Sequence, residues 1–436
     1  MRPRLIVLTR YPVLGTVKSR IAAELGAEAA LALHRELAEH ALRRARAVEL
    51  AGAVDMEIRL ADGSAADGRR WLGHRLRVRP QREGTLGDRL AEALGTAISE
   101  GAPAAIAIGA DCPDVGGSII REAIAHLDRA PVALGPAEDG GYYLVGVRAD
   151  VSEAVTAALF EQIPWGTSEV LAVTLARLSA REISPVLLPT LADIDRPEDS
   201  RRWEARRSED GSRVSVVVPA LDEESTVASA VLSARVAGAY EVIVADGGST
   251  DATVALAEDA GALVVHAPRG RAVQMNAGAA IATGDTLLFL HADTVLPPDA
   301  CAQAARVLDD SRAVGGAFGY SAGSETDRLD RFISAMGQLR YAIFRLPYGD
   351  QAIFARRSVL EDLGGFPELP VMEDREFALR LKRLGGLGRA PGAVRTSARA
   401  WRERGLIGAT ARDMATIAGY RLGIDPARLA RWRSGR

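Results

Sequence analysis

Residues 242–253 read VIVADGGSTDAT, and this stretch indicates the fold of the second half of the chain. A run of β-branched residues ends at Asp246, Gly247 and Gly248 permit a tight turn, and Ser249 opens a helical stretch. Continuous apolar strands are typical of parallel sheets, where both faces are buried. Because ligands of such sheets lie at the carboxyl ends of the strands, Asp246 is placed to bind the base or ribose of a nucleotide. A plain turn without a ligand is the alternative interpretation.

Two further segments of the second half are apolar strands that run into acidic residues. Residues 216–224 read VVVPALDEE, and residues 287–299 read LLFLHADTVLPPD. The acids of the first segment either cap the next helix or accept hydrogen bonds from a nucleobase or ribose. Asp293 offers the hard carboxylate oxygen that Mg²⁺ and Mn²⁺ prefer beside phosphate. The alternative is that Asp293 caps a turn and His291 is a packed side chain.

A pair of acids precedes the amphipathic helix expected in residues 370–385, PVMEDREFALRLKRLG. Glu373 and Asp374 would lie near the positive N-terminal end of that helix. Paired carboxylates at a binding site are a natural source of a general base that deprotonates an attacking nucleophile. A helix cap followed by a first-turn acid is the simpler alternative.

The first half of the chain repeats this layout. AAIAIGAD runs into Asp111 as TLLFLHAD runs into Asp293, and apolar strands alternate with helical patterns in both halves. Such alternation predicts βαβ units. We therefore expect an α/β protein made of two related domains with mainly parallel sheets, at residues 1–199 and 214–394. The charged segment at residues 200–213 would be a linker or a surface helix.

Composition excludes several classes of protein. The chain has 436 residues, enough for about two or three domains, and a net charge of −3, which gives no global reason to expect nucleic-acid binding. Cys112 and Cys301 are the only cysteines, which excludes a disulfide scaffold and suits a reducing compartment. No apolar run approaches the ~18 residues of a membrane span. We therefore expect a cytoplasmic location.

Together the segments of the second half resemble the family-2 glycosyltransferases of the GT-A fold over residues 214–384. With the repeated layout, the resemblance implies a tandem of two GT-A-like (Rossmann-like) nucleotide-diphospho-sugar transferase domains. It assigns Asp374, beside Glu373, as the catalytic base. It assigns Asp293 as the metal ligand, with His291 in place of the first aspartate of the family's D-x-D motif.

The same resemblance extends to the donor site. GRAVQMNAGAA, residues 270–280, resembles the family's segment beside the donor, and residues 348–351 resemble the loop that lines the donor sugar and acceptor. The donor-binding residues that the resemblance implies are Pro219, Asp222, Glu223, Asp246, Ser249, Arg271, Asn276, Gly278, Asp350 and Gln351.

The reaction implied by the resemblance is an inverting transfer from a nucleotide sugar, a UDP-sugar above all, with Mg²⁺ or Mn²⁺. The acceptor would be a small molecule or a lipid. Processive members of the family carry Q-x-x-R-W after the base, whereas residues 398–405 read ARAWRERG and lack the glutamine. A single, non-processive transfer is therefore expected.

The first half carries its own candidate site. TRYPVLGTVKSRIA, GADCPDV, GPAEDGGYYLVGV, PWGTSEV and ADIDRPED resemble an uncharacterised transferase family related to the 2-phospholactate guanylyltransferases. A glycine-containing loop with basic residues at a helix start suits phosphate, although solvated surface charges explain it equally well. Asp193 and Asp195 could complete a metal pair. The nucleotide and metal candidates are Gly15, Lys18, Arg20, Asp111, Asp114, Asp139 and Asp195.

The segment at residues 395–436 is a basic, amphipathic tail with ten arginines against Glu403, Asp413 and Asp425. Such a segment either packs on the transferase domain or lies on an anionic membrane, which would place the protein at the inner membrane face.

Two other functions fit the same sequence. In the first, the chain is a nucleotidyltransferase that makes an activated sugar or metabolite, and the second domain recognises the acceptor. In the second, the first half is a non-catalytic nucleotide-binding or scaffold module beside a glycosyltransferase.

Overall fold

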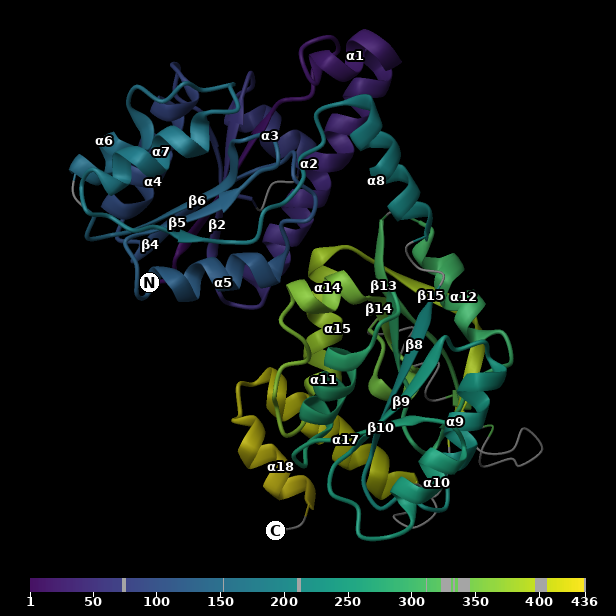
Figure 1. Cartoon of the computed structure of the whole chain (residues 1–436). Helices are drawn as coiled ribbons and strands as arrows, with labels where there is room; N and C mark the ends of the chain where they lie inside the picture. The colour runs from purple at the N-terminus through teal and green to yellow at the C-terminus, as the bar shows by residue number, and fades with distance from the viewer. Residues whose placement is uncertain are drawn as a thin grey trace. The chain divides into compact units, whose positions relative to one another are not determined.

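In the computed structural model the chain divides into two compact units (Figure 1). Unit 1 is residues 1–207 and unit 2 is residues 208–436, apart from the three residues 361–363, which group with unit 1. The structure describes residues 1–72, 76–151, 153–209, 213–310, 312–322, 331, 334–335, 346–396 and 406–434.

Unit 1 is a seven-stranded sheet in the order β3-β2-β1-β4-β6-β5-β7. The first four of these strands are parallel, β6 is antiparallel to both of its neighbours, and β7 is parallel to β5. The strands are β1 (Arg4–Arg10), β2 (Asp55–Ala61), β3 (Val78–Pro80), β4 (Ala104–Gly109), β5 (Val132–Pro136), β6 (Tyr142–Arg148) and β7 (Val186–Leu187). The helices are α1 (Ser19–Leu25), α2 (Ala27–Leu50), α3 (Ala65–Leu72), α4 (Leu86–Ser99), α5 (Gly117–Leu127), α6 (Glu153–Phe160), α7 (Val170–Ser179) and α8 (Pro197–Glu209).

Unit 2 is an eight-stranded sheet in the order β10-β9-β8-β11-β14-β13-β15-β12. Its strands are β8 (Val214–Ala220), β9 (Glu241–Asp246), β10 (Leu263–His266), β11 (Thr286–Phe289), β12 (Thr294–Val295), β13 (Ala313–Ala322), β14 (Phe354–Arg356) and β15 (Gly386–Thr396). Its helices are α9 (Val227–Val236), α10 (Thr253–Asp259), α11 (Arg271–Ile281), α12 (Ala300–Leu308), the 3-10 turn η1 (Gly349–Gln351), α14 (Arg357–Asp362), α15 (Glu373–Leu384), α17 (Leu406–Arg421) and α18 (Pro426–Ser434).

The two sheets have the same topology. Setting aside the extra edge strand β12, both sheets place the third, second, first, fourth, sixth, fifth and seventh strands side by side. Both also have a single strand, β6 or β14, that is antiparallel to its two neighbours. The expectation of two related α/β domains with mainly parallel sheets is therefore confirmed.

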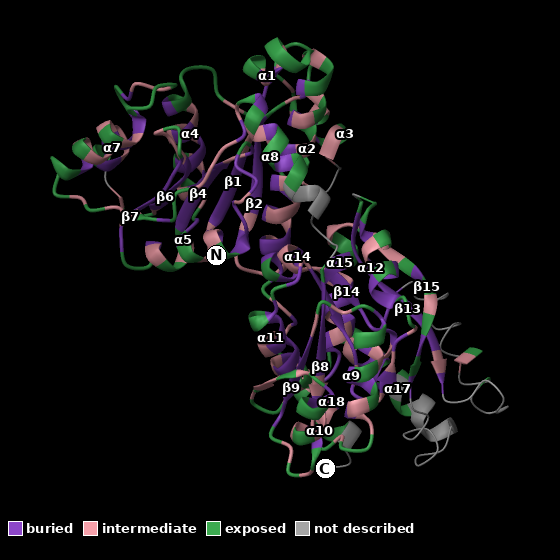
Figure 2. Cartoon of the chain, turned by 45° about the vertical axis from the view of Figure 1, so that its right-hand side comes forward, coloured by how far each residue is buried: buried purple, intermediate pink, exposed green. Residues whose placement is uncertain are grey.

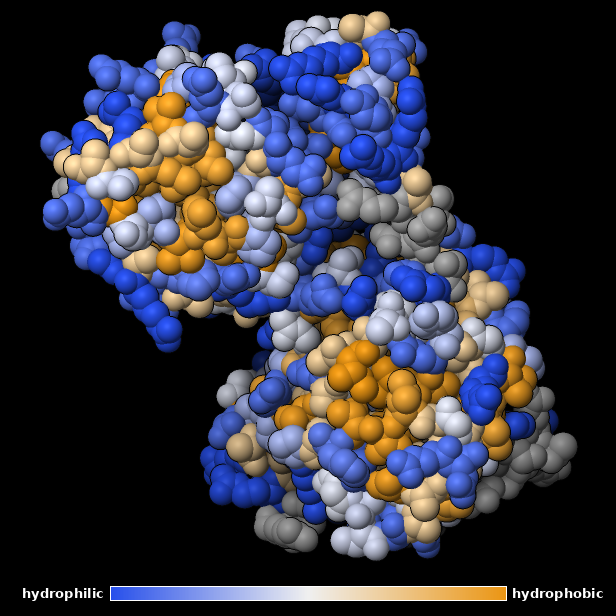
Figure 3. Space-filling view, viewed as in Figure 1, coloured by the Kyte–Doolittle hydropathy of each residue, from blue (hydrophilic) through white to orange (hydrophobic). Residues whose placement is uncertain are grey.

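The central strands are buried on both faces, as their continuous apolar sequence predicts (Figure 2). In unit 1, separate apolar clusters form on the two sides of the sheet, around Val7 and Ile106 and around Ile6 and Val145. In unit 2, Gly278 allows α11 to pack closely on β8. A Cβ atom at this position would lie only 2.4 Å from Val217 Cγ1. Apolar patches remain at the surface of each unit on the side drawn in Figure 3.

Most of the charged segment at residues 200–213 is helical. Helix α8 continues to Glu209, and its residues through Arg207 group with unit 1. The reason is Trp203, which is buried in a cluster with Ile21, Leu37 and Ile194 and donates a hydrogen bond from Nε1 to Glu36 Oε1 at 2.7 Å. At the other boundary, β15 continues to Thr396 and so includes the first two residues of the expected tail.

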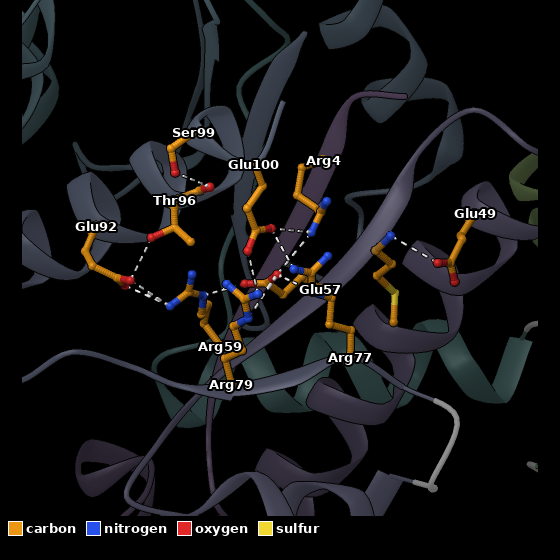
Figure 4. Close-up of polar contacts among 11 residues, drawn as sticks. Arg4, Glu49, Glu57, Arg59, Arg77, Arg79, Glu92, Thr96, Ser99 and Glu100 are labelled. Carbon is orange, nitrogen blue, oxygen red and sulfur yellow. Dashed lines mark hydrogen bonds and ion pairs between the residues drawn. The ribbon is translucent and has the colours of Figure 1, made fainter. Parts of the chain in front are cut away.

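A buried ion-pair network lies on the sheet of unit 1 beneath α4 (Figure 4). Glu57 on β2 is 1% exposed and accepts hydrogen bonds from Arg59 Nε at 2.7 Å and Arg4 Nη1 at 3.2 Å. Arg77 and Arg79 on or next to β3 also pair with Glu57, at 3.0 and 3.7 Å. Glu57 thus pairs with four arginines, two of them buried, and Glu92 and Glu100 pair with the same arginines.

Replacing Glu57 should therefore destabilise unit 1 strongly. Glu57→Gln removes the 1%-exposed carboxylate of the network and leaves Arg4 paired with Glu100 at 3.5 Å and Arg59 with Glu92 at 2.8 Å, so we expect a loss of up to about 3–5 kcal/mol. Calorimetric unfolding of the full chain measures this change. The matched control is Asp150→Asn, which removes an exposed pair with Arg148 and should cost less than about 1 kcal/mol. Equal stability of the two variants would contradict the role given to Glu57.

Candidate active site

The carboxyl ends of β8 and β9 are joined by a set of hydrogen bonds from side chain to backbone. Asp246 ends β9, is buried, and accepts from the N–H groups of Gly248 at 3.0 Å and Ser249 at 3.1 Å. Ser249 Oγ in turn accepts from the N–H of Asp222 at 2.9 Å. Burial alone would raise the pKa of Asp246, but the hydrogen bonds from Ser249, Gly248 and His266 outweigh it and lower that pKa. Asp246 is therefore a carboxylate held by its own turn.

The loop after β8 depends on an unusual backbone conformation. Asp222 has φ +52°, in the left-handed region, and its Oδ1 accepts from the N–H of Thr250 at 2.9 Å. An aspartate tolerates this region because its short side chain bonds locally to the backbone. The loops after β8 and β9, and with them Asp222, Asp246 and Ser249, are thus brought together as expected. Pro219 lies beside them within β8, opposite Ala245 of β9.

A second group of candidate residues surrounds Arg271 at the start of α11. Arg271 Nη1 pairs with Glu373 Oε1 at 3.2 Å and lies within electrostatic range of Asp293 and His291. Burial and the neighbouring Glu223 raise the pKa of Asp293, and burial and the neighbouring Asp374 raise the pKa of Glu373. Four acidic side chains, Glu223, Asp293, Glu373 and Asp374, therefore share this region with Arg271.

Asp374 occupies the first turn of α15 and is anchored by backbone N–H groups. Its Oδ2 accepts from Gly349 at 2.7 Å, and its Oδ1 accepts from Arg375 at 2.6 Å. Each carboxylate oxygen has two lone pairs, so Asp374 can accept a proton in addition to these two hydrogen bonds.

His291 packs against Gly349 and lies close enough to Asp374 for their charges to interact. A Cβ at position 349 would be 2.7 Å from His291 Nε2, so glycine is required there. Burial and then Arg271 hold the pKa of His291 far below its usual range, and the imidazole is neutral at pH 7. Among the described residues, its buried Nε2 has no hydrogen-bond partner.

Three of the residues expected at the donor site make structural contacts. The side-chain amide of Asn276 makes two hydrogen bonds with the backbone of Phe366. Asn276 Nδ2 donates to the carbonyl of Phe366 at 2.9 Å, and the N–H of Phe366 donates to Asn276 Oδ1 at 2.8 Å. Gly278 permits the close packing of α11 on β8. The Gln351 side chain is buried and bonds Tyr348 N and Phe318 O. Asp350 lies beside it in η1.

Gln274 is a residue of this region that the sequence analysis did not select. Its buried Nε2 donates to the carbonyls of Ala220 at 2.7 Å and Ala245 at 2.9 Å, which are at the ends of β8 and β9. Gln274 therefore holds the ends of β8 and β9, and the loops that follow them, at a fixed spacing. The sequence signal that could have identified Gln274 is its position as a polar residue on the apolar, inward-facing side of helix α11.

In unit 1 the expected residues converge around Lys18. Its side chain is 6% exposed, and Nζ pairs with Asp111 Oδ1 at 2.6 Å and Asp195 Oδ1 at 3.1 Å. Burial alone would lower the pKa of Lys18, but the two carboxylates outweigh it and raise that pKa. Arg20 pairs with Asp195 at 3.7 Å. Lys18 is thus the internal counter-ion of a group of acids.

Asp193 adds to this group, because burial first and then Asp139 and Asp195 raise its pKa to about 6. Asp139 accepts from the N–H of Gly141 at 2.8 Å. Asp114 instead neighbours the buried thiol of Cys112. Gly15 turns the preceding exposed loop at φ +81°. Asp111 follows β4, which is the topological position that Asp293 holds after β11 in unit 2.

Within the described ranges, no group of three or more His, Cys, Asp or Glu side chains is arranged to hold a metal ion by itself. No described helix is long and apolar enough to cross a membrane. Residues 398–405, which bear on processivity, lie outside the described residues.

Comparison with known proteins gives each unit a separate match. Residues 215–364 match the family described as glycosyl transferase family 2, and residues 37–167 match a family described as uncharacterized proteins conserved in bacteria (DUF2064). The first match supports a glycosyltransferase function for unit 2. The second leaves the resemblance of unit 1 to guanylyltransferases a prediction.

An uncharacterized glycosyltransferase of Mycobacterium tuberculosis is 33% identical over 171 residues, which are 37% of this chain and 64% of the relative. The chain thus spans just under two thirds of that relative's length. Solved structures include a nucleotide-diphospho-sugar transferase from Desulfovibrio desulfuricans (29% identity, 45% of this chain and 84% of that one, TM-score 0.41). Another is M. tuberculosis glucosyl-3-phosphoglycerate synthase with Mn²⁺ and UDP (24% identity, 51% and 83% of the chains, TM-score 0.37).

Proposed function

We propose that unit 2 transfers a sugar from a nucleotide-diphosphate donor, with a UDP-sugar as the first candidate, to an acceptor hydroxyl. The observation that carries the proposal is the convergence of two groups at one edge of the sheet. Asp222, Asp246 and Ser249 meet at the ends of β8 and β9, while Arg271, Asp293 and Asp374 meet at the ends of β11 and the start of α15. Ligands of open α/β sheets bind at this edge.

The two groups suit the two ends of a nucleotide sugar. The ordered loops after β8 and β9 offer carboxylate and backbone partners to a base and ribose. Arg271 offers a cation to the diphosphate, where charge develops as the sugar–phosphate bond breaks. Glu223 follows Asp222 in the chain and lies electrostatically close to Asp293, so it links the two groups.

In the proposed reaction the acceptor oxygen attacks the anomeric carbon from the face opposite the diphosphate. The carbon–oxygen bond to the acceptor forms, the bond to the diphosphate oxygen breaks, and Asp374 takes the acceptor proton as general base. One displacement inverts the anomeric centre. Glu373 is paired with Arg271 and positions that guanidinium.

The residues present fit a divalent cation only in part. Asp293 is a half-buried hard oxygen ligand beside a second acid, Glu223, and burial first and then Glu223 raise the pKa of Asp293. A bound Mg²⁺ or Mn²⁺ would neutralise charge on the leaving diphosphate. Asp293 would hold it, and phosphate oxygens would complete its ligands. The neutral, partly buried His291 packs against Gly349 and would order the site.

The test is turnover by the full chain with a panel of UDP-, GDP- and dTDP-sugars in the presence of Mg²⁺ or Mn²⁺. Slow release of nucleoside diphosphate by hydrolysis reports a competent donor site even when the acceptor is unknown. Binding and hydrolysis of a subset of the panel supports the proposal. Absence of both for every donor would contradict it.

For unit 1 we propose a second nucleotide site, which binds a nucleoside di- or triphosphate with Mg²⁺. The supporting observation is that Lys18, Asp111, Asp193 and Asp195 lie together at the carboxyl edge of its sheet. Nucleotidyl transfer by this site would be recognised by release of pyrophosphate. Binding without release would favour a regulatory or scaffold role.

Lys18→Ala should weaken nucleotide binding at the unit 1 site by about 1–3 kcal/mol, because it removes a charged hydrogen bond to phosphate. Calorimetric titration of the parent chain should show two nucleotide-binding events. The Lys18→Ala chain should show only one event, or two events of which one has a reduced affinity. Arg70→Ala, an exposed arginine of α3, is the control that leaves both events intact. Unchanged binding in Lys18→Ala would contradict the assignment.

A further inference from the structure

Helices α17 and α18 form a hairpin, residues 406–434, that is attached to unit 2 by one face (Figure 1). Ile417 and Leu429 are buried in a cluster with Tyr348, Val371 and Met372. These three partners lie directly beside Gly349 and Asp374, in the loop before η1 and the turn before α15. The hairpin therefore packs against the segments that precede η1 and α15, next to the proposed base Asp374.

Polar contacts fix the hairpin in this place. Tyr420 donates from its hydroxyl to Glu376 Oε2 at 3.3 Å, and the guanidinium of Arg375 lies 5.8 Å from the centre of the Tyr420 ring. Both partners are on α15, one and two positions after Asp374. Any surface that the hairpin binds is thus held at a set position relative to the proposed base.

The hairpin also exposes large apolar side chains. Leu422 is 82% exposed and Trp432 is 50% exposed, and Met414 and Ile424 are also exposed. Arg412, Arg421, Arg428 and Arg431 of the hairpin are exposed as well, and Asp425 is an exposed acid of the turn between the helices. Tryptophan and leucine next to arginine are the composition of helices that lie in a membrane interface.

We propose that the hairpin docks unit 2 on an anionic membrane surface, so that the acceptor approaches Asp374 from the lipid side. The proposal rests on the proposed function for the position of the acceptor. Charge complementarity commits it to an anionic bilayer. The apolar side chains lie in the turn between the helices and on helix surfaces separated by arginines, an arrangement that inserts in a headgroup layer. An acceptor carried by a lipid headgroup follows as the substrate class.

The test is co-sedimentation of the full chain with vesicles of phosphatidylcholine alone and with 30% phosphatidylglycerol. We expect binding to the anionic vesicles only, weakened by salt because exposed charges are screened. Leu422→Ser/Trp432→Ser should reduce the partition coefficient at least about tenfold. Arg428→Glu should reduce it roughly 30-fold, at about fivefold for each unit of charge.

Matched controls sit on other helices of the same unit. Leu232→Ser/Val236→Ser replaces two exposed apolar residues of α9, and Arg306→Glu reverses an exposed arginine of α12. Both should bind vesicles like the parent chain. Equal binding to both vesicle types, or hairpin variants that bind like the parent, would overturn the proposal. So would hairpin variants that change only self-association in sedimentation velocity, since the face would then bind a second copy.

Donor hydrolysis in the absence of vesicles separates this proposal from the proposed function. The hairpin variants leave the donor site intact, so their hydrolysis rates should equal that of the parent. Vesicle binding without donor hydrolysis would contradict the proposed function alone, and hydrolysis without vesicle binding would contradict the membrane proposal alone.

Discussion

The Asp374→Asn variant should transfer sugar at least about 100-fold more slowly than the parent chain, with donor affinity largely unchanged. Asparagine keeps the shape of the side chain and can still accept from the N–H of Gly349 through its oxygen. It cannot take the acceptor proton, and loss of a general base costs about 10²–10⁴-fold in rate. Steady-state turnover with the donor found by the panel, and calorimetric donor binding, measure the two quantities.

The matched control is Glu376→Gln, two residues further along α15. Glu376 accepts from Tyr420 rather than facing the proposed site, so its loss should leave turnover within a few fold. Equal thermal unfolding of the three chains guards against a folding effect. Near-normal turnover of Asp374→Asn would remove Asp374 from the role of base, while a fall in both variants would indicate disruption of α15.

The fold could be predicted to the level of two similar α/β domains because burial on both faces leaves a clear trace in the strands. The runs around Val217, Val244 and Leu288 are continuously apolar, and each ends in an acid or a turn. The antiparallel strands β6 and β14 could not be placed in the sheet order from the same signal. Their residues are equally buried, and periodicity does not report strand direction.

The candidate site was predictable where its contacts are local. Asp246 and Ser249 are three residues apart, and Glu373 and Asp374 are adjacent, so turn and helix geometry bring them together. Contacts between distant segments were not predictable. The amide of Asn276 is committed to Phe366, 90 residues away, and Gln274 bridges two strand ends that no local pattern connects.

In unit 1 the sequence indicated the residues but not their balance of charge. Lys18 was expected to face phosphate, yet its Nζ is already paired with Asp111 and Asp195. A phosphate that approaches it must compete with these carboxylates. Nucleotide binding there should therefore be accompanied by a cation that neutralises Asp111 and Asp195, which is the reason to measure it with and without Mg²⁺.

Asp293→Ala should lower kcat/KM for sugar transfer by at least about 100-fold and should remove the response to added divalent cation. Asp293 is the one carboxylate of the HADT loop, residues 291–294, and it lies in a partly buried position beside Glu223. Charge stabilisation at a leaving diphosphate is worth several kcal/mol, and each 1.36 kcal/mol is a factor of about ten in rate. Turnover across a titration of Mg²⁺ and Mn²⁺ measures both effects.

The His291→Asn variant is the comparison for Asp293→Ala. His291 is neutral and packed against Gly349, so its replacement should lower turnover through the order of the site while the dependence on divalent cation persists. If His291 were instead a ligand, both variants would lose the cation response together. Full activity of the parent chain after metal stripping, in excess chelator, would contradict the role of Asp293. In that case Arg271 would supply the positive charge that faces the diphosphate. Arg271→Gln should then lower turnover more than any other substitution at this edge of the sheet.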